Sequence, residues 1–395
     1  MVTKPQHNTI PQEFEDIAPY DDSMFKEKIK SLVRESGFEN AVKYVMPNVD
    51  YPALVNQLLS VENQKDFQYN VMGQVLESLE KATTSGIKLH GLENISEDES
   101  YTFITNHRDI VLDASFLNLG FIRAGYPITQ IAIGNNLLIY EWITDLVKLN
   151  RSIIVKRDVK MARALEAAKQ LSGYIHYTIN QLHESVWIAQ REGRAKDSND
   201  LTQESLIKMI SLAGDGSVKE NILSAHLCPV SISYEYDPND YLKAREFLLK
   251  QRDPQFKKSQ HDDLFSMETG ILKHKGRVTF RIGGCINDDL EACTSENRAE
   301  IVRETCRLID NKIHAGYEIY QCNYIAYDEI NEGQRFADKY TADDERHFNE
   351  YVESQLDKVQ DIGAISQEER QYMRHMMLTM YANPLKNKLQ VESRL

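Results

Sequence analysis

Apolar residues in the first part of the chain recur at the spacing of helices that bury one face. Three stretches follow this pattern: 22–44, 51–63 and 66–83. Asp22-Ser23 can cap the first helix, and Ser85-Gly86 can end the third. We therefore expect residues 1–86 to form an N-terminal helical segment.

Short β-like runs alternate with helical stretches in the central part of the chain. The expected strands are 101–105, 128–133, 152–156, 185–189, 228–234 and 276–282. The expected helices are 110–124, 136–148, 158–183, 203–213 and 295–313. Such alternation predicts βαβ units. We therefore expect an α/β domain over residues 87–335, with a largely parallel central sheet flanked by helices.

The tail of the chain is charged and again has a helical pattern, which predicts a helical C-terminal extension over residues 336–395. Four methionines gather on one face of it: Met373, Met376, Met377 and Met380. Core packing is the favoured explanation. A membrane-touching face is the alternative, because methionine adapts to apolar surfaces.

Composition narrows the class of protein. The net charge of −14 argues against broad nucleic-acid binding, which needs a basic footprint. The five cysteines lack the spacing of metal ligands, so we expect reduced thiols in a cytosolic protein. The N-terminus lacks the apolar core of a signal peptide, and no stretch approaches the roughly 18 apolar residues of a membrane span. Any work on lipids would therefore take place at the membrane surface.

The stretch 105–117, TNHRDIVLDASFL, is the strongest candidate for chemistry. It places His107 at a strand-to-helix turn, with Asp109 and Asp113 nearby, and such turns commonly form the floor of active sites in α/β sheets. A carboxylate that fixes the tautomer of a histidine prepares it to act as a general base. The structural alternative is a helix cap, with both carboxylates complementing the helix dipole.

Polar and basic residues follow three other expected strands. Gly134-Asn135-Asn136 allows close approach of the backbone to a ligand, and Lys156-Arg157 offers two cations for a phosphate. The stretch 191–196 combines Glu192, Gly193, Arg194 and Lys196.

No Walker A loop, HExxH, GxSxG or metal-ligand cluster occurs in the sequence. A His/Asp pair with scattered cations fits direct acyl transfer to an alcohol that carries a phosphate.

Four blocks in order resemble the glycerolipid acyltransferase superfamily, and most closely its glycerol-3-phosphate acyltransferase branch. They are similar to 1-acylglycerol-3-phosphate acyltransferases as well. The blocks are NHRDIVLD (106–113), GNNLL (134–138) with IIVKR (153–157), REGR (191–194) and CPVSI (228–232). The resemblance covers about residues 100–235.

Two blocks depart from the family pattern. The family has four residues between its His and Asp, whereas five separate His107 from Asp113. Each residue of a regular helix turns by about 100°, so this insertion requires a bulge or makes Asp109 the orienting carboxylate. We favour Asp113 and keep Asp109 as the alternative. The third block reads EGR in place of EGTR, which leaves Arg194 and Lys196 as alternatives for one phosphate ligand.

The resemblance implies a mechanism without metal or cofactor. His107 removes the proton of a glycerol hydroxyl, the alkoxide attacks the thioester of acyl-CoA or acyl-carrier protein, and nearby backbone amides stabilise the oxyanion. The implied substrate-binding residues are Arg157, Arg194, Lys156 and Lys196 for the phosphate, Asn136 and Glu192 for hydroxyls, and Gly193 for close approach of amides.

The resulting hypothesis is a glycerol-3-phosphate O-acyltransferase of phospholipid biosynthesis. We expect it to be cytoplasmic and peripheral on the inner face of the membrane, with no nucleic-acid partner. Acylation of lysophosphatidic acid is the alternative within this class. A lipid-binding homologue that has lost catalysis is the alternative outside it.

Overall fold

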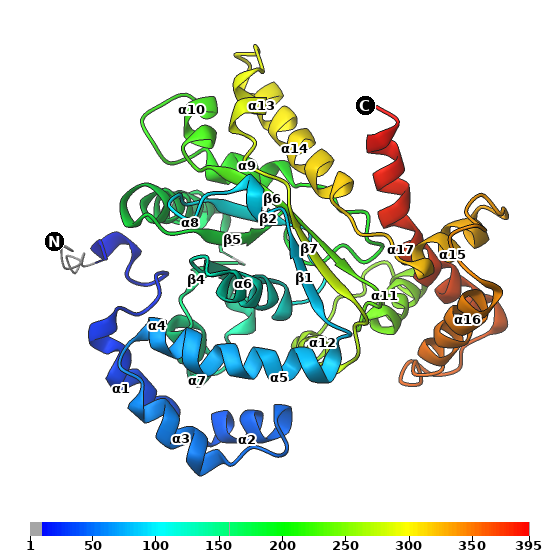
Figure 1. Cartoon of the computed structure of the whole chain (residues 1–395), viewed down its shortest axis with the longest axis horizontal. Helices are drawn as coiled ribbons and strands as arrows, with labels where there is room; N and C mark the ends of the chain where they lie inside the picture. Colours follow the sequence, from blue (N-terminus) through cyan, green and yellow to red (C-terminus); the bar gives the residue numbers. More distant parts are fainter. Residues whose placement is uncertain (1–9, 158, 395) are drawn as a thin grey trace.

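The computed structural model describes residues 10–157 and 159–394, and its centre is a seven-stranded sheet (Figure 1). The strands are β1 (Ile87–His90), β2 (Thr102–Thr105), β3 (Gln130–Gly134), β4 (Ser152–Val155), β5 (Val186–Ala189), β6 (Leu227–Tyr234) and β7 (Val278–Ile282). Their order in the sheet is β1-β7-β6-β2-β5-β3-β4. The strands from β6 to β4 run parallel, and the β1–β7 pair runs opposite to them. The predicted α/β fold with a largely parallel sheet is confirmed.

Helices cover both faces of this sheet because successive side chains of a strand point to opposite sides. Phe103 of β2 packs on one face with α5 (Gly73–Thr83) and α6 (Leu112–Ala124). Ile104 packs on the other face with α8 (Met161–Tyr177), α9 (Glu204–Ile210) and α14 (Arg298–Ala315). The remaining helices of this region are α7 (Glu141–Leu149), α10 (Val218–Leu223), α11 (Asp240–Arg252), α12 (Gln260–Leu272) and α13 (Asn287–Glu291).

The N-terminal part is helical, as predicted, but the single helix expected over 22–44 is two helices. These are α1 (Asp22–Leu32) and α2 (Ser36–Val45), and they are followed by α3 (Tyr51–Ser60), α4 (Gln64–Asp66) and the π-helical segment Phe67–Met72. Leu32 and Phe38 face one hydrophobic cluster, which also includes Leu149 of α7. At about 100° per residue, a straight helix would turn these two side chains to different sides. The break at Glu35 lets both enter the cluster.

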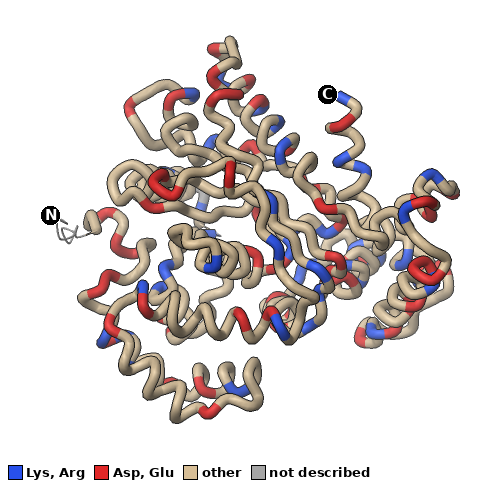
Figure 2. Tube along the Cα trace, in the orientation of Figure 1, with Lys and Arg blue, Asp and Glu red and all other residues tan. Residues whose placement is uncertain are grey.

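The C-terminal part forms a further layer of helices that shares a core with α11. Its helices are α15 (Gln321–Ile330), α16 (Ala342–Leu356) and α17 (Gln367–Glu392). Met373, Met377 and Met380 are buried in this core, in agreement with the core-packing explanation of the methionine face. Acidic and basic residues are interspersed along the outer helices (Figure 2). Within the described ranges, every helix is too short or too polar to span a bilayer.

Candidate active site

The parallel part of the sheet gathers the predicted site residues at one edge. The carboxyl ends of β2, β3, β4 and β5 point the same way, because these strands pair in parallel. His107 follows β2, Asn136 follows β3, Arg157 follows β4 and Arg194 lies in the loop after β5. This edge is where ligands bind in open α/β sheets.

His107 is paired with Asp113. Its Nδ1 atom lies 2.8 Å from Asp113 Oδ2, and the same oxygen accepts the backbone N–H groups of Arg108 at 2.7 Å and Asp109 at 3.0 Å. Asp113 is fully buried, whereas the His107 side chain keeps 13% of its surface exposed. We assign the Nδ1 proton to the Asp113 contact, which leaves the Nε2 lone pair available. This is the arrangement that a histidine general base requires.

Asp109 serves a different purpose at the same turn. Its Oδ1 accepts the N–H groups of Val111 at 2.9 Å and Leu112 at 2.7 Å, so Asp109 caps the start of α6. Its other carboxylate oxygen packs against Gly270 of α12, where a Cβ atom would overlap it. Burial raises the pKa of Asp109, and the charge of Asp113 raises it further. The charge of Lys275 acts in the opposite direction and lowers this pKa. The structure thus places Asp113 on the imidazole, and Asp109 on the helix end.

The backbone amides of this turn are already engaged. Arg108 and Asp109 donate to Asp113, while Val111 and Leu112 donate to Asp109. The expectation that amides near the motif stabilise an oxyanion is therefore wrong for these four. They hold the two carboxylates in place instead.

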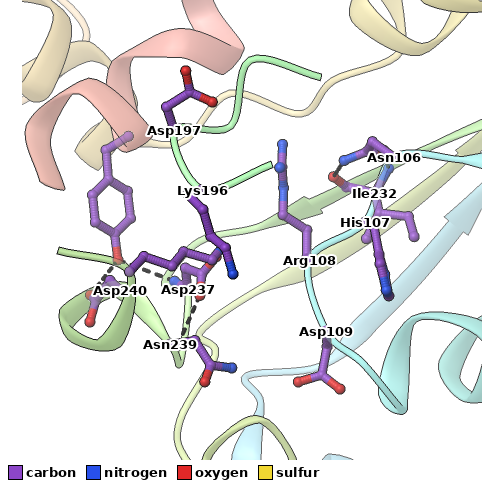
Figure 3. A network of polar contacts seen from close by, with 12 residues as sticks. Asn106, His107, Arg108, Asp109, Lys196, Asp197, Ile232, Asp237, Asn239 and Asp240 are labelled. Carbon is purple, nitrogen blue, oxygen red and sulfur yellow. Dashed lines mark hydrogen bonds and ion pairs between the residues drawn. The ribbon is translucent and has the colours of Figure 1, made fainter. Parts of the chain in front are cut away.

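Asn106 fixes the turn from its other side. Its side-chain amide donates to the carbonyl of Ile232 at 2.9 Å and accepts from the N–H of Ile232 at 2.8 Å, which extends the β2–β6 ladder by one step (Figure 3). The Trp187 ring meets the His107 ring edge-on, with 5.9 Å between centroids. Sequence reasoning assigned no role to Asn106. A polar residue between a buried strand and the candidate base was the available signal.

Arg157 lies between the residues that follow β3 and β5. A Cβ atom on Gly134 would stand 2.5 Å from Asn136 Oδ1 and 2.6 Å from Arg157 Nε, so the bare glycine makes room for both side chains. Glu192 Oε1 lies 3.9 Å from Arg157 Nη1 and is highly exposed. The structure therefore brings Asn136, Arg157 and Glu192 together.

Lys156 is not part of this group. Its ammonium group pairs with Asp16 and donates to Gln170 Oε1 at 2.8 Å, so it faces the N-terminal segment and α8. The side chains of neighbouring residues at a strand end point to opposite sides of the sheet. The side chains of Lys156 and Arg157 therefore point in different directions. The structure does not bring Lys156 to the candidate phosphate site.

The loop after β5 carries a buried cation. Gly193 has a φ of 68°, a conformation that favours glycine, and Arg194 beside it is buried. Arg194 Nη1 has no hydrogen-bond partner among the described residues. Lys243 and Arg194 lower the pKa of Asp237 despite its burial. A buried guanidinium N–H without a partner is suited to bind an anion.

Lys196 follows in the same loop, two residues after Arg194; Figure 3 labels it. Its Nζ lies 3.0 Å from Glu246 Oε2 of α11. Burial and the charge of Arg194 lower the pKa of Lys196 to about 7. Because Arg194 has an unpartnered donor and Lys196 is already paired, the geometry favours Arg194 as the anion ligand.

Comparisons with known proteins show a distant structural likeness. No protein-family model matches the chain, and no curated protein matches it. Among solved structures, the chain is similar to the 1-acyl-sn-glycerophosphate (LPA) acyltransferase PlsC from Thermotoga maritima, with 15% identity and a TM-score of 0.35. The match covers 72% of this chain and 95% of that one. A likeness at this level carries no argument about function, which has to be inferred from the side chains of the site.

Proposed function

We propose that the chain is an O-acyltransferase that moves a fatty acyl group from an acyl thioester to a hydroxyl of glycerol-3-phosphate in phospholipid biosynthesis. The contact between His107 and Asp113 is the observation that carries this proposal. It provides an oriented base at the edge of the sheet. On the loop of a neighbouring strand, Arg194 Nη1 has no hydrogen-bond partner among the described residues. A phosphorylated alcohol matches both features.

In the proposed reaction, Nε2 of His107 accepts the proton of the glycerol hydroxyl as its oxygen attacks the thioester carbonyl. The tetrahedral intermediate then collapses, the carbon–sulfur bond breaks, and the thiolate takes the proton back from His107. The products are an ester and a free thiol. Asp113 holds the imidazole in the required tautomer and stabilises its protonated form.

Binding of the acceptor would fall to the other strand ends. Arg194 and Arg157 supply guanidinium groups for the phosphate, and the charge of Lys196, in the same loop as Arg194, adds to theirs. Asn136 and Glu192 lie beside Arg157 and offer an amide and a carboxylate for the remaining hydroxyl of glycerol. We propose that acyl-CoA or acyl-carrier protein is the donor, used at the membrane surface.

Product analysis by mass spectrometry tests this function. Purified protein is given palmitoyl-CoA or palmitoyl-acyl-carrier protein together with glycerol-3-phosphate or lysophosphatidic acid. The proposal predicts lysophosphatidic acid as the product from glycerol-3-phosphate. Product from lysophosphatidic acid alone would replace the proposed acceptor by that lipid. No product with any combination would favour a lipid-binding protein without catalysis.

A further inference from the structure

A forked ion pair lies next to the candidate base and is not used by the proposed reaction. Arg108 Nη1 donates to Asp200 Oδ1 at 3.1 Å, and Arg108 Nη2 donates to Asp200 Oδ2 at 2.6 Å. Only 5% of the arginine side chain and 1% of the aspartate side chain are exposed. In Figure 3, the Arg108 side chain points to the opposite side of the turn from Asp109.

Asp200 is anchored to the end of α14 as well. The Tyr317 hydroxyl donates to Asp200 Oδ2 at 2.6 Å, and His314 Nε2 lies 2.6 Å from the carbonyl oxygen of Asp200. Burial raises the pKa of Tyr317 well above its usual value, and the charge of Asp200 adds to this effect. Asp200 therefore accepts a hydroxyl and a complete guanidinium fork, both of them buried.

The loop that contains Asp200 also contains Arg194. Its two ends meet where Gln203 N–H donates to the carbonyl of Gln190 at 3.0 Å, and Gln190 N–H donates to the carbonyl of Thr105 at 2.8 Å. Arg108 follows His107 directly, so the fork joins the turn that bears the base to the loop that bears the candidate phosphate ligand.

We propose that Asp200 is a positioning residue that, through Arg108, holds the His107 turn and the Arg194 loop at a fixed separation. This inference rests on the proposed function for its catalytic consequence. A buried ion pair contributes little net stability compared with apolar groups of similar size. Its planar fork does fix direction and distance, and a reacting pair misplaced by about 1 Å can lose about 10²-fold in rate.

The test removes the whole polar group, so that no lone buried charge remains. The triple variant Arg108→Met, Asp200→Leu, Tyr317→Phe replaces it with apolar side chains. We compare kcat/KM for glycerol-3-phosphate with kcat/KM for glycerol. Glycerol has no phosphate, so its reaction does not depend on the distance between the His107 turn and the Arg194 loop. The ratio of the two should fall by about 100-fold. A loss of folded protein alone would lower both values together and leave the ratio unchanged.

Two further variants sharpen the comparison. Arg108→Lys keeps the charge but loses the fork, so the ratio should fall in that variant as well. The matched control is Arg123→Met with Glu80→Leu, a forked pair between α5 and α6 that lies outside the site. Loss of this control pair should leave the ratio of the two kcat/KM values unchanged.

Amide hydrogen exchange gives a readout that does not depend on activity. In the triple variant, exchange should quicken in both 106–111 and 190–203, while segments that do not contact Asp200 or Arg108 keep their rates. If the wild type acylates neither acceptor, the proposed function fails and exchange alone decides the positioning role. Two results would overturn the inference. One is an active triple variant in which the ratio of kcat/KM for glycerol-3-phosphate to kcat/KM for glycerol is unchanged, and the other is unchanged exchange in 106–111 or in 190–203.

Discussion

His107 Nδ1 lies 2.8 Å from Asp113 Oδ2, although these residues are six positions apart along the chain. In a regular helix, the extra residue compared with the family pattern would carry the carboxylate about 100° around the axis. The chain avoids this because α6 begins only at Leu112. The residues between His107 and Leu112 form an irregular turn, in which Asp109 caps the start of α6. Helical geometry therefore does not fix the number of residues in this turn.

The two carboxylates of the turn should differ in their effect on turnover. Asp113→Asn should lower kcat by about 10²–10⁴-fold, because the imidazole loses the group that fixes its tautomer. Asp109→Asn should cost far less, since asparagine caps a helix about as well as aspartate does. Steady-state kinetics measures both, with circular dichroism as a check on folding. Equal losses in the two variants would contradict the assignment of Asp113.

Arg157 and Lys156 are neighbours whose loss should have different effects. Arg157→Ala should raise KM for glycerol-3-phosphate by about 10–100-fold with little change in kcat, as expected for loss of a hydrogen bond to a charged group. Lys156→Ala serves as the matched control, because its partners are Asp16 and Gln170. If Lys156→Ala raised KM as much as Arg157→Ala, the phosphate would lie elsewhere.

Asp240 should make stability depend on pH. Burial raises its pKa from 3.8 to about 7. Between these values the folded protein keeps a proton that the unfolded chain has released, so the free energy of unfolding falls as pH rises. The slope is at most about 1.4 kcal/mol per pH unit. Asp240→Asn keeps an acceptor for the hydroxyls of Tyr351 and Tyr381 and removes the titration.

Urea unfolding of both proteins between pH 5 and pH 8 checks this expectation. The wild type should lose stability relative to Asp240→Asn as pH rises towards 7, and the difference should level off above that pH. Parallel pH profiles for the two proteins would show that Asp240 does not titrate in this range.

Gly270 is needed for the close packing of α12 on Asp109. Alanine normally favours a helix over glycine by about 1 kcal/mol. At this position its Cβ would overlap the buried carboxylate of Asp109, so Gly270→Ala should destabilise the fold by about 1–3 kcal/mol. Gly73→Ala is the matched control, since its nearest atom would be 3.6 Å away, and it should be neutral or stabilising. Urea unfolding measures both, and equal effects would contradict the close packing of α12 on Asp109.

Most of the sheet could be predicted from sequence because its strands are apolar and separated by helices. The strand β1 was missed, since its burial alternates over only four residues at the edge of the sheet. The helices α10 and α13 were missed too, and they have only six and five residues. The ten-residue helix α15 was missed as well. The break between α1 and α2 depends on a cluster shared with α7, which no local pattern reveals.

At the site, the sequence identified which residues follow the strands but not which way they point. It grouped Lys156 with Arg157, although their side chains part at the end of β4. It gave no role to Arg108 or Asp200, because a contact across 92 positions leaves no local signature. Lys243 of α11 pairs with Asp237 beside Arg194 and lies outside the four blocks, so it too became visible only in three dimensions.

The most direct measurement is thiol release from palmitoyl-CoA, monitored for the wild type and for His107→Ala, with and without glycerol-3-phosphate. If acyl-CoA is inert, the same assay uses acyl-carrier protein as donor. We predict release that depends on glycerol-3-phosphate in the wild type and is absent in a folded His107→Ala variant. Acceptor-dependent release that survives in His107→Ala would contradict the role of His107 as the base.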